Sequence, residues 1–247
     1  MIREVFSSIM GEGKYIGKRF IFVRFKKCPL NCIYCDEPNT SKGVPQFEYI
    51  SGSGIIEEIP DLAEKLVENI EKIKTPDLFA VSFTGGEPLV YSKYIQKYAK
   101  ELREKGYKTF LESNGMFPEA VKDADYYDYA SIDIKLPEHF DKTNKVIEWE
   151  ELYNKELETI ANLYKNGTEV YAKVVIFEDT SNELIEKIAR DISKIGNITL
   201  CIQPITPIEG LNIKPPAQKK IFEIMELCGK YVDVMFTPQI HKWMNML

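Results

Sequence analysis

The sequence lacks any apolar run of the roughly 18 residues that a membrane-spanning helix needs. Its first 25 residues include the charged residues Arg3, Glu4, Glu12 and Lys14, so the apolar stretch of a secretory signal is missing as well. There is no basic excess either, because 32 Lys and Arg stand against 38 Asp and Glu, a formal charge of −6. This balance argues against bulk nucleic acid as a partner. We therefore expect a cytoplasmic protein that binds neither membranes nor nucleic acid.

Histidine and cysteine are scarce, with two and five residues respectively among 247. An odd number of cysteines excludes a complete disulfide framework, so cysteine is expected to serve chemistry in a reducing compartment. Cys201 and Cys228 lie in a predicted strand and on an apolar helical stripe, and we expect both to be buried small hydrophobic residues. Two cysteines are too few for a second all-cysteine cluster. His139 lies in a polar segment and is expected at the surface.

Short segments rich in β-branched and aromatic residues alternate with amphipathic segments along the chain. The predicted strands are Phe20–Phe25, Phe79–Phe83, Lys108–Leu111, Tyr129–Ile134, Glu169–Phe177, Ile198–Ile202 and Val232–Phe236. The predicted helices are Asp61–Ile73, Tyr94–Lys105, Leu152–Tyr164, Asn182–Ile195 and Gln218–Cys228. This alternation predicts an α/β fold with a mainly parallel sheet that curls into a partial or complete barrel. We expect a single domain over residues 1–247, with an insertion or flap at 43–60, where glycines and polar residues interrupt the alternation.

Three cysteines, Cys28, Cys32 and Cys35, follow directly on the first predicted strand with the spacing C-x3-C-x2-C. Thiolates at this spacing can hold one face of a soft metal centre, such as zinc, copper(I) or an iron–sulfur cluster. One interpretation is a zinc site that Cys201, Cys228 or a histidine completes, since tetrahedral zinc normally has four ligands. The other is a [4Fe-4S] cluster held by three cysteines, which leaves one iron open for a further ligand.

A C-x3-C-x2-C motif after the first strand of such a barrel resembles the signature of the radical S-adenosylmethionine (SAM) superfamily. The resemblance implies a partial (β/α)6-type barrel and a [4Fe-4S] cluster whose open iron binds SAM. It also implies reductive cleavage of SAM to a 5′-deoxyadenosyl radical that abstracts hydrogen from the substrate. Tyr34, between the second and third cysteines, corresponds to an aromatic residue that would pack on the adenine; a plain core aromatic is the alternative.

Other motifs follow the later strands at their carboxyl ends, where parallel sheets hold their chemistry. Thr84-Gly85-Gly86-Glu87-Pro88 resembles the superfamily's GGEP loop, which binds the SAM amino group, although a tight turn before a helix would use similar residues. The Glu112–Gly115 segment resembles an E-T/S-N-G motif, and Asp133–Lys135 matches a Ser-Pro-Lys-like segment at Lys135 only. The resemblance implies SAM contacts from Tyr34, Gly85, Gly86, Glu87, Glu112, Ser113, Asn114, Asp133, Ile134, Lys135, Gln203 and Pro204.

The segment Glu4–Gly13, followed by Gly17 and the strand with Arg24, resembles the opening of one family within the superfamily, the 7-carboxy-7-deazaguanine synthases. The resemblance extends from Glu4 to His241. It implies conversion of 6-carboxy-5,6,7,8-tetrahydropterin into 7-carboxy-7-deazaguanine with release of ammonia, on the route to the tRNA nucleosides queuosine or archaeosine. SAM would be regenerated and act as a cofactor.

The same resemblance implies a substrate site. Arg24 would bind the substrate carboxylate through its planar, permanently charged fork. The alternatives are a solvated Arg24, an ordinary loop-tip charge at Glu12 and a capping or surface histidine at His241. The implied substrate-binding residues are Ile9, Met10 and Gly11 through their backbone, Glu12, Arg24, Thr84, His241 in the C-terminal Q-x-H-K-like tail, and the terminal carboxylate of Leu247.

Two departures from the family pattern concern Met10 and the magnesium ligand. The family has Gln at the position of Met10, so only backbone contacts are expected there. The family places Thr or Ser two residues after the last cysteine as a ligand of Mg2+. Here that residue is Glu37, a suitable hard ligand, and Thr40 is the alternative. The resemblance further implies a flavodoxin- or ferredoxin-type electron donor and a homodimer.

No acid–base residue is assigned, although Glu12, Glu112 and Lys135 are candidates. Two rival functions stay open at this point. A glycyl-radical-enzyme activase shares the cysteine and GGEP-like motifs but acts on a protein. A noncatalytic, zinc-stabilised binding module needs only the cysteines and an ordinary α/β fold.

Overall fold

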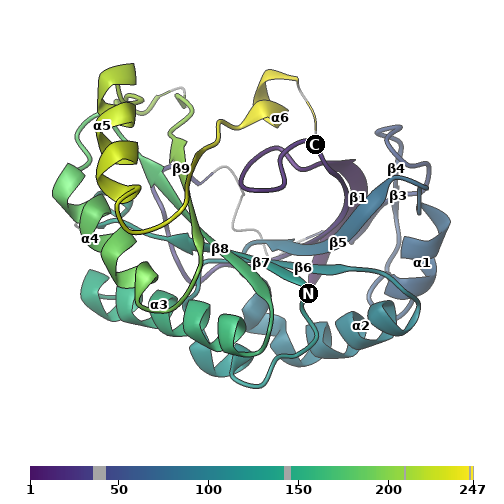
Figure 1. Cartoon of the computed structure of the whole chain (residues 1–247). Coiled ribbons are helices and arrows are strands. Elements are labelled where there is room, and N and C mark those ends of the chain that lie inside the picture. The colour runs from purple at the N-terminus through teal and green to yellow at the C-terminus, as the bar shows by residue number, and fades with distance from the viewer. Residues whose placement is uncertain (36–42, 142–145, 209, 245, 247) are drawn as a thin grey trace.

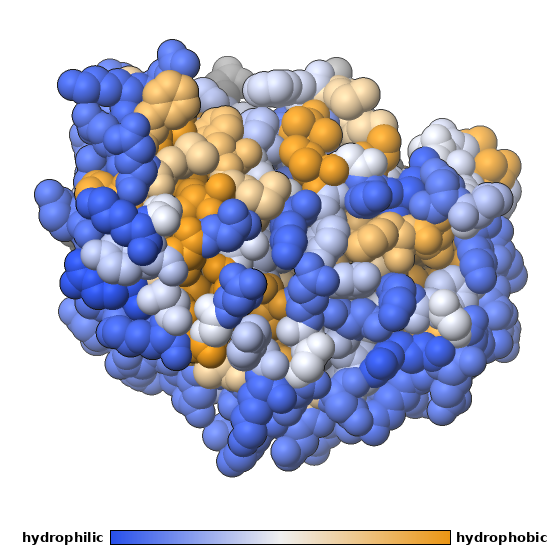
Figure 2. Space-filling model, in the orientation of Figure 1, coloured by the Kyte–Doolittle hydropathy of each residue, from blue (hydrophilic) through white to orange (hydrophobic). Residues whose placement is uncertain are grey.

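The computed structural model of the chain describes residues 1–35, 43–141, 146–208, 210–244 and 246. Among these residues, ten strands form one curved sheet in the order β10-β9-β8-β7-β6-β5-β2-β1-β3-β4. The helices α1 to α5 cover the outer, convex face of the sheet, and the short helix α6 lies near its open end (Figure 1). In the same view, hydrophilic side chains cover the rim over α2 and α3, while apolar ones are seen mainly toward the middle (Figure 2).

The strands are β1 (Ile2–Ile9), β2 (Arg19–Phe25), β3 (Gln46–Glu48), β4 (Ile56–Glu58), β5 (Leu78–Gly85), β6 (Thr109–Ser113), β7 (Tyr129–Ile134), β8 (Glu169–Ile176), β9 (Thr199–Pro204) and β10 (Val234–Phe236). The α-helices are α1 (Leu66–Lys72), α2 (Ser92–Glu104), α3 (Trp149–Lys165), α4 (Asn182–Ser193), α5 (Gln218–Cys228) and α6 (Ile240–Trp243). Three 3-10 helices complete the described elements, namely η1 (Pro88–Tyr91), η2 (Pro118–Val121) and η3 (Pro137–His139).

All seven predicted strands are present, as β2 and β5 to β10, and each neighbouring pair among them is parallel. The α/β class with a mainly parallel sheet is thereby confirmed. Such strands need crossover connections. The five predicted helices are present as α1 to α5 in five of these connections, and the 3-10 helix η2 lies in the sixth, between β6 and β7. In α4, for example, Ser181 caps the first turn by accepting from the Leu184 N–H at 3.2 Å, and a stripe that includes Ile185 and Ile192 is buried against the sheet.

The sequence analysis missed β1 and the hairpin β3–β4. β1 pairs antiparallel with β2 and parallel with β3, and polar residues within it conceal its strand character. Ser7, for example, is buried, but Glu48 accepts its N–H at 2.8 Å and Arg19 donates to its hydroxyl at 2.9 Å. The 43–60 segment contains β3 and β4, which extend the sheet at its edge. None of its residues lines the cavity described below.

Strand alternation divides the side chains of the sheet into two sets. On β2, Ile21, Val23 and Phe25 belong to the large core under the helices. Phe20 and Phe22 point the other way, into an aromatic cluster inside the curved sheet with members from β1, β5, β6, β8 and β9. This cluster fills one end of the interior. Of the helices in the described residues, none combines the length and apolar character needed to cross a lipid bilayer.

Candidate active site

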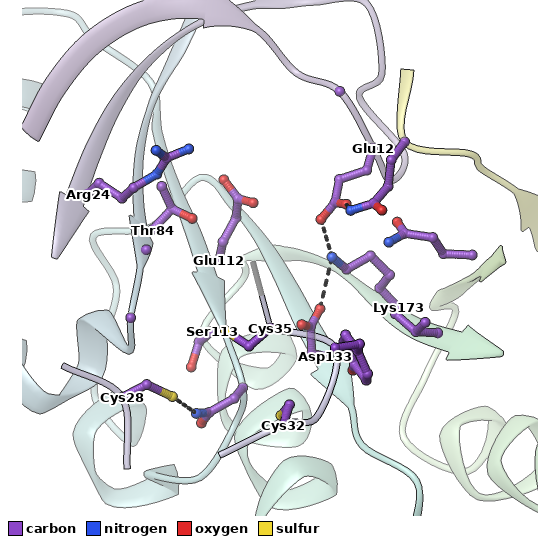
Figure 3. A pocket seen from close by; sticks show the side chains of 18 of the residues that line it. Glu12, Arg24, Cys28, Cys32, Cys35, Thr84, Glu112, Ser113, Asp133 and Lys173 are labelled. Atoms are coloured by element: carbon purple, nitrogen blue, oxygen red, sulfur yellow. Dashed lines mark hydrogen bonds and ion pairs between the residues drawn. The ribbon is translucent and has the colours of Figure 1, made fainter. Parts of the chain in front are cut away.

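A cavity of about 470 Å³ lies inside the curved sheet, at the carboxyl ends of the parallel strands (Figure 3). Strand register brings its walls together. Arg24 on β2 lies beside Thr84 on β5, and Asp133 on β7 lies beside Lys173 on β8. Glu112 on β6 also faces the cavity. Because alternate residues of each strand point inward, a ring of polar side chains stands above the aromatic cluster.

Two glycines allow the ends of β2 and β5 to approach closely. Gly85 has φ +78°, and a Cβ there would lie 2.1 Å from the Arg24 Cγ. A Cβ on Gly86 would lie 2.3 Å from the Lys27 carbonyl oxygen, which accepts the Glu87 N–H at 2.8 Å. Only glycine fits at these positions, so the GGEP-like motif is a steric requirement for packing the cysteine loop against β5.

The three cysteines of the motif line the same cavity at one end (Figure 3). The Asn114 amide contacts the Cys28 sulfur at 3.5 Å. Burial raises the pKa of Cys28 to about 11 and also raises that of Cys32, so these thiols are protonated until a cation favours the thiolates. Among the described residues, no three His, Cys, Asp or Glu side chains are close enough together to hold a metal ion. Cluster binding therefore requires the loop to bring the sulfurs of Cys28, Cys32 and Cys35 together.

The cysteine loop is attached to η3 through its backbone and through Tyr34. Ile33 donates its N–H to the His139 carbonyl at 2.9 Å, and Cys32 forms an isolated β-bridge with Phe140. The Tyr34 hydroxyl lies 3.2 Å from His139 Nδ1, and the two rings are nearly perpendicular. The segment around η3 thus holds the loop in place.

The expectation that His139 is at the surface is wrong, because its side chain is fully buried. Its Nδ1 accepts the Leu136 N–H at 3.0 Å, and its Nε2 lies 2.9 Å from the Val175 carbonyl oxygen. A carbonyl only accepts, so Nε2 carries the proton and the ring is neutral. Burial lowers the pKa of His139 to about 3. The prediction rested on the polar residues around His139, but His139 itself points inward from the short helix η3.

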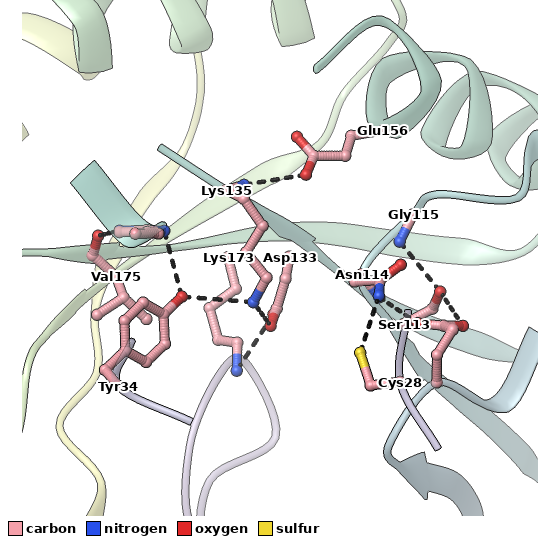
Figure 4. A network of polar contacts seen from close by, with 12 residues as sticks. Cys28, Tyr34, Ser113, Asn114, Gly115, Asp133, Lys135, Glu156, Lys173 and Val175 are labelled. Atoms are coloured by element: carbon pink, nitrogen blue, oxygen red, sulfur yellow. Dashed lines mark hydrogen bonds and ion pairs between the residues drawn. The ribbon is translucent and has the colours of Figure 1, made fainter. Parts of the chain in front are cut away.

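We call the chain of alternating charges formed by Lys135, Asp133, Lys173 and Glu12 the cavity floor; Figure 4 draws the first three of them. The Lys135 ammonium lies 3.4 Å from the Tyr34 hydroxyl and 2.8 Å from Asp133, and Asp133 lies 3.2 Å from the Lys173 ammonium. Lys173 in turn pairs with Glu12. Burial opposes ionisation of Asp133, but Lys135 and Lys173 outweigh it and hold the pKa of that carboxyl at about 2. Burial likewise opposes ionisation of Glu12, and Lys173 keeps its pKa below the ordinary value.

Glu112 and Glu87, two further carboxyl groups at the site, form no ion pair within the part of the chain that the structure describes. Glu112 faces the cavity and accepts the Ser82 hydroxyl at 2.5 Å. Glu87 accepts the Ser113 hydroxyl and the Asn114 N–H, both at 2.8 Å, and thereby joins the loops after β5 and β6. Burial raises the pKa of each carboxyl to about 7. Glu112 thus presents a carboxyl group of near-neutral pKa to the cavity, whereas Glu87 joins the loops after β5 and β6.

Arg24 is positioned by contacts at the other end of the cavity. Its Nη1 lies 2.6 Å from a Glu4 oxygen, and its guanidinium lies 4.8 Å from the centre of the Phe6 ring. The side chain is only 21% exposed and lines the cavity. These contacts place a planar, permanently charged fork at the cavity wall.

Comparisons with known proteins agree with this geometry. The Radical SAM superfamily model matches residues 22–192, more than half of the chain. A 7-carboxy-7-deazaguanine synthase of Methanocaldococcus jannaschii is 59% identical over the full length of both chains. Another, of Methanothermobacter thermautotrophicus, is 36% identical over 99% of this chain and 97% of its own. The chain belongs to the 7-carboxy-7-deazaguanine synthase family.

Solved structures support the radical SAM fold of this family member. The crystal structure of QueE from Escherichia coli matches 96% of this chain and 92% of its own, with a TM-score of 0.59 and 17% identity. A domain of a pyruvate-formate lyase-activating enzyme from Bacteroides vulgatus matches 64% of this chain and 98% of its own, with a TM-score of 0.52 and 15% identity. At these identities the likeness concerns the fold alone, so the second match carries no support for an activase function.

Most of the residues that the sequence analysis assigned to the site of this synthase family member line the one cavity. They are Ile9, Met10, Gly11, Glu12, Arg24, Cys28, Cys32, Tyr34, Cys35, Thr84, Gly85, Gly86, Glu112, Ser113, Asn114, Asp133, Lys135, Gln203 and His241. Glu87, Ile134 and Pro204 are described but do not line it. Glu37, Thr40 and Leu247 lie outside the described residues.

The sequence analysis missed Lys173 and Gln239, which both line the cavity and contact Glu12. A signal for Lys173 existed, because a lysine in the middle of the apolar strand β8 has no reason to be buried without a partner. Gln239 lies in the tail that had already suggested His241. Cys201 and Cys228 are fully buried, as expected, in the aromatic cluster and in the large core respectively, and neither lines the cavity.

Proposed function

We propose that the chain converts 6-carboxy-5,6,7,8-tetrahydropterin into 7-carboxy-7-deazaguanine with release of ammonia. The family membership supports this reaction. The observation that carries it is that one cavity combines the loop of Cys28, Cys32 and Cys35 with the charged groups of Glu12 and Arg24 (Figure 3). Soft metal ligands therefore stand across the cavity from groups that suit a polar, carboxylated heterocycle.

The three thiols are the donor type that a [4Fe-4S] cluster takes, and the polar residues around them in the cavity suit SAM. When bound, these groups supply the one-electron chemistry of the reaction. Gln203 is 3% exposed, and its side-chain oxygen is a buried acceptor without a partner among the described residues, which suits a bound N–H or O–H donor. The residues that would hold SAM are Tyr34, Gly85, Gly86, Glu112, Ser113, Asn114, Asp133, Lys135 and Gln203.

At the other end, Arg24 would bind the carboxylate of the pterin, and Glu12 its polar edge. The loop after β1 is well fixed for this task, because Gly11 accepts the Ile240 N–H at 2.9 Å and lies directly against the His241 ring. A Cβ on Gly11 would lie 2.0 Å from the His241 Nδ1, so the loop and the tail pack closely only with glycine there. The backbone at Ile9, Met10 and Gly11, with Thr84 and His241, would complete the contacts.

We also propose that Mg2+ takes part, bound by Glu37 or Thr40, and that the terminal carboxylate of Leu247 faces the substrate. A flavodoxin- or ferredoxin-type protein would donate electrons, and the chain would work as a cytoplasmic homodimer. The resemblance of the motifs to those of the family supports these assignments. The donor set for Mg2+ is chemically suitable, since hard cations prefer oxygen ligands.

The test is an anaerobic assay of the reconstituted chain with SAM, a reductant, Mg2+ and the carboxypterin, followed by mass spectrometry of the product. Formation of 7-carboxy-7-deazaguanine is the expected result, with loss of product when Mg2+ is chelated. Metal analysis separates the zinc-stabilised alternative, because one zinc and no inorganic sulfide per chain would contradict the enzymatic assignment. A glycyl radical formed on a partner protein, without turnover of the pterin, would favour the activase instead.

A further inference from the structure

Lys173 is a buried cation that contacts two acidic residues of the cavity wall, Glu12 and Asp133. No motif in the sequence assigns it a role. It lies on β8, is 7% exposed and lines the cavity. Its ammonium pairs with Glu12, from the loop after β1, and with Asp133 on β7 at 3.2 Å (Figure 3). Asp133 has a second cation, Lys135, at 2.8 Å, whereas Glu12 has Lys173 and the Gln239 amide, which donates at 3.0 Å.

Lys173 matters more for keeping Glu12 ionised than for keeping Asp133 ionised. A buried carboxylate that loses its only cation is strongly disfavoured in its ionised form. The other titratable groups near Glu12 are Asp133 and Glu112. Both are acidic, so neither favours a negative charge on Glu12. Lys173 is therefore the group that keeps Glu12 ionised inside the cavity.

The hydrogen-bonding capacity of Glu12 leaves room for a ligand. An ionised carboxylate only accepts hydrogen bonds, at about four lone-pair positions. Lys173 occupies one oxygen and Gln239 the other, so about two positions remain. The Glu12 side chain is 18% exposed and lines the cavity, so these positions are accessible from within it.

We propose that Lys173 is a positioning residue that fixes Glu12 as an ionised acceptor and thereby selects ligands whose polar edge presents two neighbouring N–H donors. The inference rests on the proposed function, because the amino-pyrimidinone edge of a pterin has such donors in its 2-amino group and N3–H. A lumazine, which has a carbonyl in place of the 2-amino group, presents an acceptor there and would face the carboxylate unfavourably. Discrimination of this kind is strong when a buried polar group is left unpaired.

The experiment measures binding of two stable oxidised analogues, 6-carboxypterin and 6-carboxylumazine, to the anaerobically reconstituted enzyme with SAM. We expect the wild-type enzyme to prefer the pterin by about 30-fold or more. Lys173→Met should weaken pterin binding by about 30-fold and change lumazine binding by less than about 3-fold. Lys173→Arg, which keeps the charge, should recover most of the preference. SAM affinity should change by less than about 3-fold, because Lys135 still pairs with Asp133.

The chain offers a matched control in Lys14. Its ammonium lies 2.8 Å from Glu169, so this pair also joins the loop after β1 to β8, but both side chains are substantially exposed. Lys14→Met should leave both affinities unchanged, since exposed pairs contribute little. A change as large as that of Lys173→Met would mean that any tie between the loop and β8 suffices, and would overturn the role of Lys173.

The double-mutant cycle of Lys173→Met with Glu12→Gln tests whether Lys173 acts through Glu12. If it does, the two effects on pterin affinity overlap and the double variant binds about as weakly as either single variant. Fully additive effects would overturn the inference. Should Lys173→Met fail to fold, Glu12→Gln alone decides, because an unchanged preference for the pterin there also overturns it. Failure of the wild-type enzyme to bind either analogue would instead contradict the proposed function.

Discussion

His139→Phe removes the hydrogen bonds of a buried imidazole while keeping an aromatic ring of similar size. The ring would still pack against Tyr34 and Phe177. The Leu136 N–H and the Val175 carbonyl would lose the partners that they have at 3.0 and 2.9 Å. Each buried polar group left unpaired costs about 1–3 kcal/mol, so we expect the free energy of unfolding to fall by about 3 kcal/mol. At about 2–4 °C per kcal/mol for a chain of this size, Tm falls by about 6–12 °C.

The pH dependence of the free energy of unfolding provides a second, independent test of the buried, neutral histidine. The pKa of His139 is lowered to about 3 by burial, against 6.5 for the ordinary group. Below pH 6.5 the unfolded chain therefore binds a proton that the folded chain does not, and the wild-type protein loses stability as the pH falls. Phenylalanine has no proton to bind. The stability difference between His139→Phe and the wild type should accordingly shrink by about 1 kcal/mol between about pH 7.5 and about pH 5.5.

Urea unfolding of the full chain at the two pH values, in matched preparations, measures both quantities. Tyr34→Phe removes only the hydroxyl that lies 3.2 Å from the imidazole, so its effect should be smaller than that of His139→Phe. Glu119→Gln, on an exposed pair with Lys122, should stay within about 0.5 kcal/mol of the wild type. A His139→Phe variant as stable as Glu119→Gln, or one whose deficit is the same at both pH values, would refute the buried, neutral histidine.

Three further predictions concern the cavity. Burial raises the pKa of Glu112 from 4.5 to about 7, so the folded chain holds a proton that the unfolded chain releases, and the free energy of unfolding falls as pH rises across that window. Glu112→Gln should remove up to about 3 kcal/mol of this loss, measured by urea unfolding at about pH 5 and pH 8; an unchanged slope would contradict it. Gly86→Ala should abolish turnover and iron incorporation, since its Cβ would lie 2.3 Å from the Lys27 carbonyl oxygen; normal iron content would refute the steric argument. Arg24→Lys should raise KM for the carboxypterin at least about 10-fold with a smaller change in kcat, because a planar fork is lost; the opposite split in steady-state kinetics would count against carboxylate binding.

The parallel strands and the loops after them were predictable from the sequence because they obey local rules. β5 to β9 are short, apolar and bounded by turns, and the sequence signal survives because both faces of these strands are mostly covered. Their carboxyl ends converge for topological reasons, so motifs that are far apart in the sequence, such as those at Cys28, Gly85 and Asp133, were expected at one edge. Cys28, Gly85 and Asp133 all line the one cavity.

What was missed depends in each case on at least one partner that lies far away in the chain. β1 has polar residues whose burial makes sense only with Arg19 and Glu48 beside Ser7. His139 is buried because the Leu136 N–H and the Val175 carbonyl saturate its ring. Neither arrangement has a periodicity or a composition that can be recognised in the sequence alone. Both appear only when the sheet brings the partners together.

We infer that the four charges on the cavity floor contribute to ligand binding rather than to the stability of the fold. Lys135, Asp133, Lys173 and Glu12 alternate in sign, and their formal charges sum to zero. Buried ion pairs of this kind contribute little net stability, and apolar residues of similar volume would often serve the fold as well. The convex face of the same strands already supplies an apolar core. The inward-facing charges are therefore best explained by the ligands of the cavity, because their geometry fixes hydrogen-bond acceptors and donors before any ligand arrives.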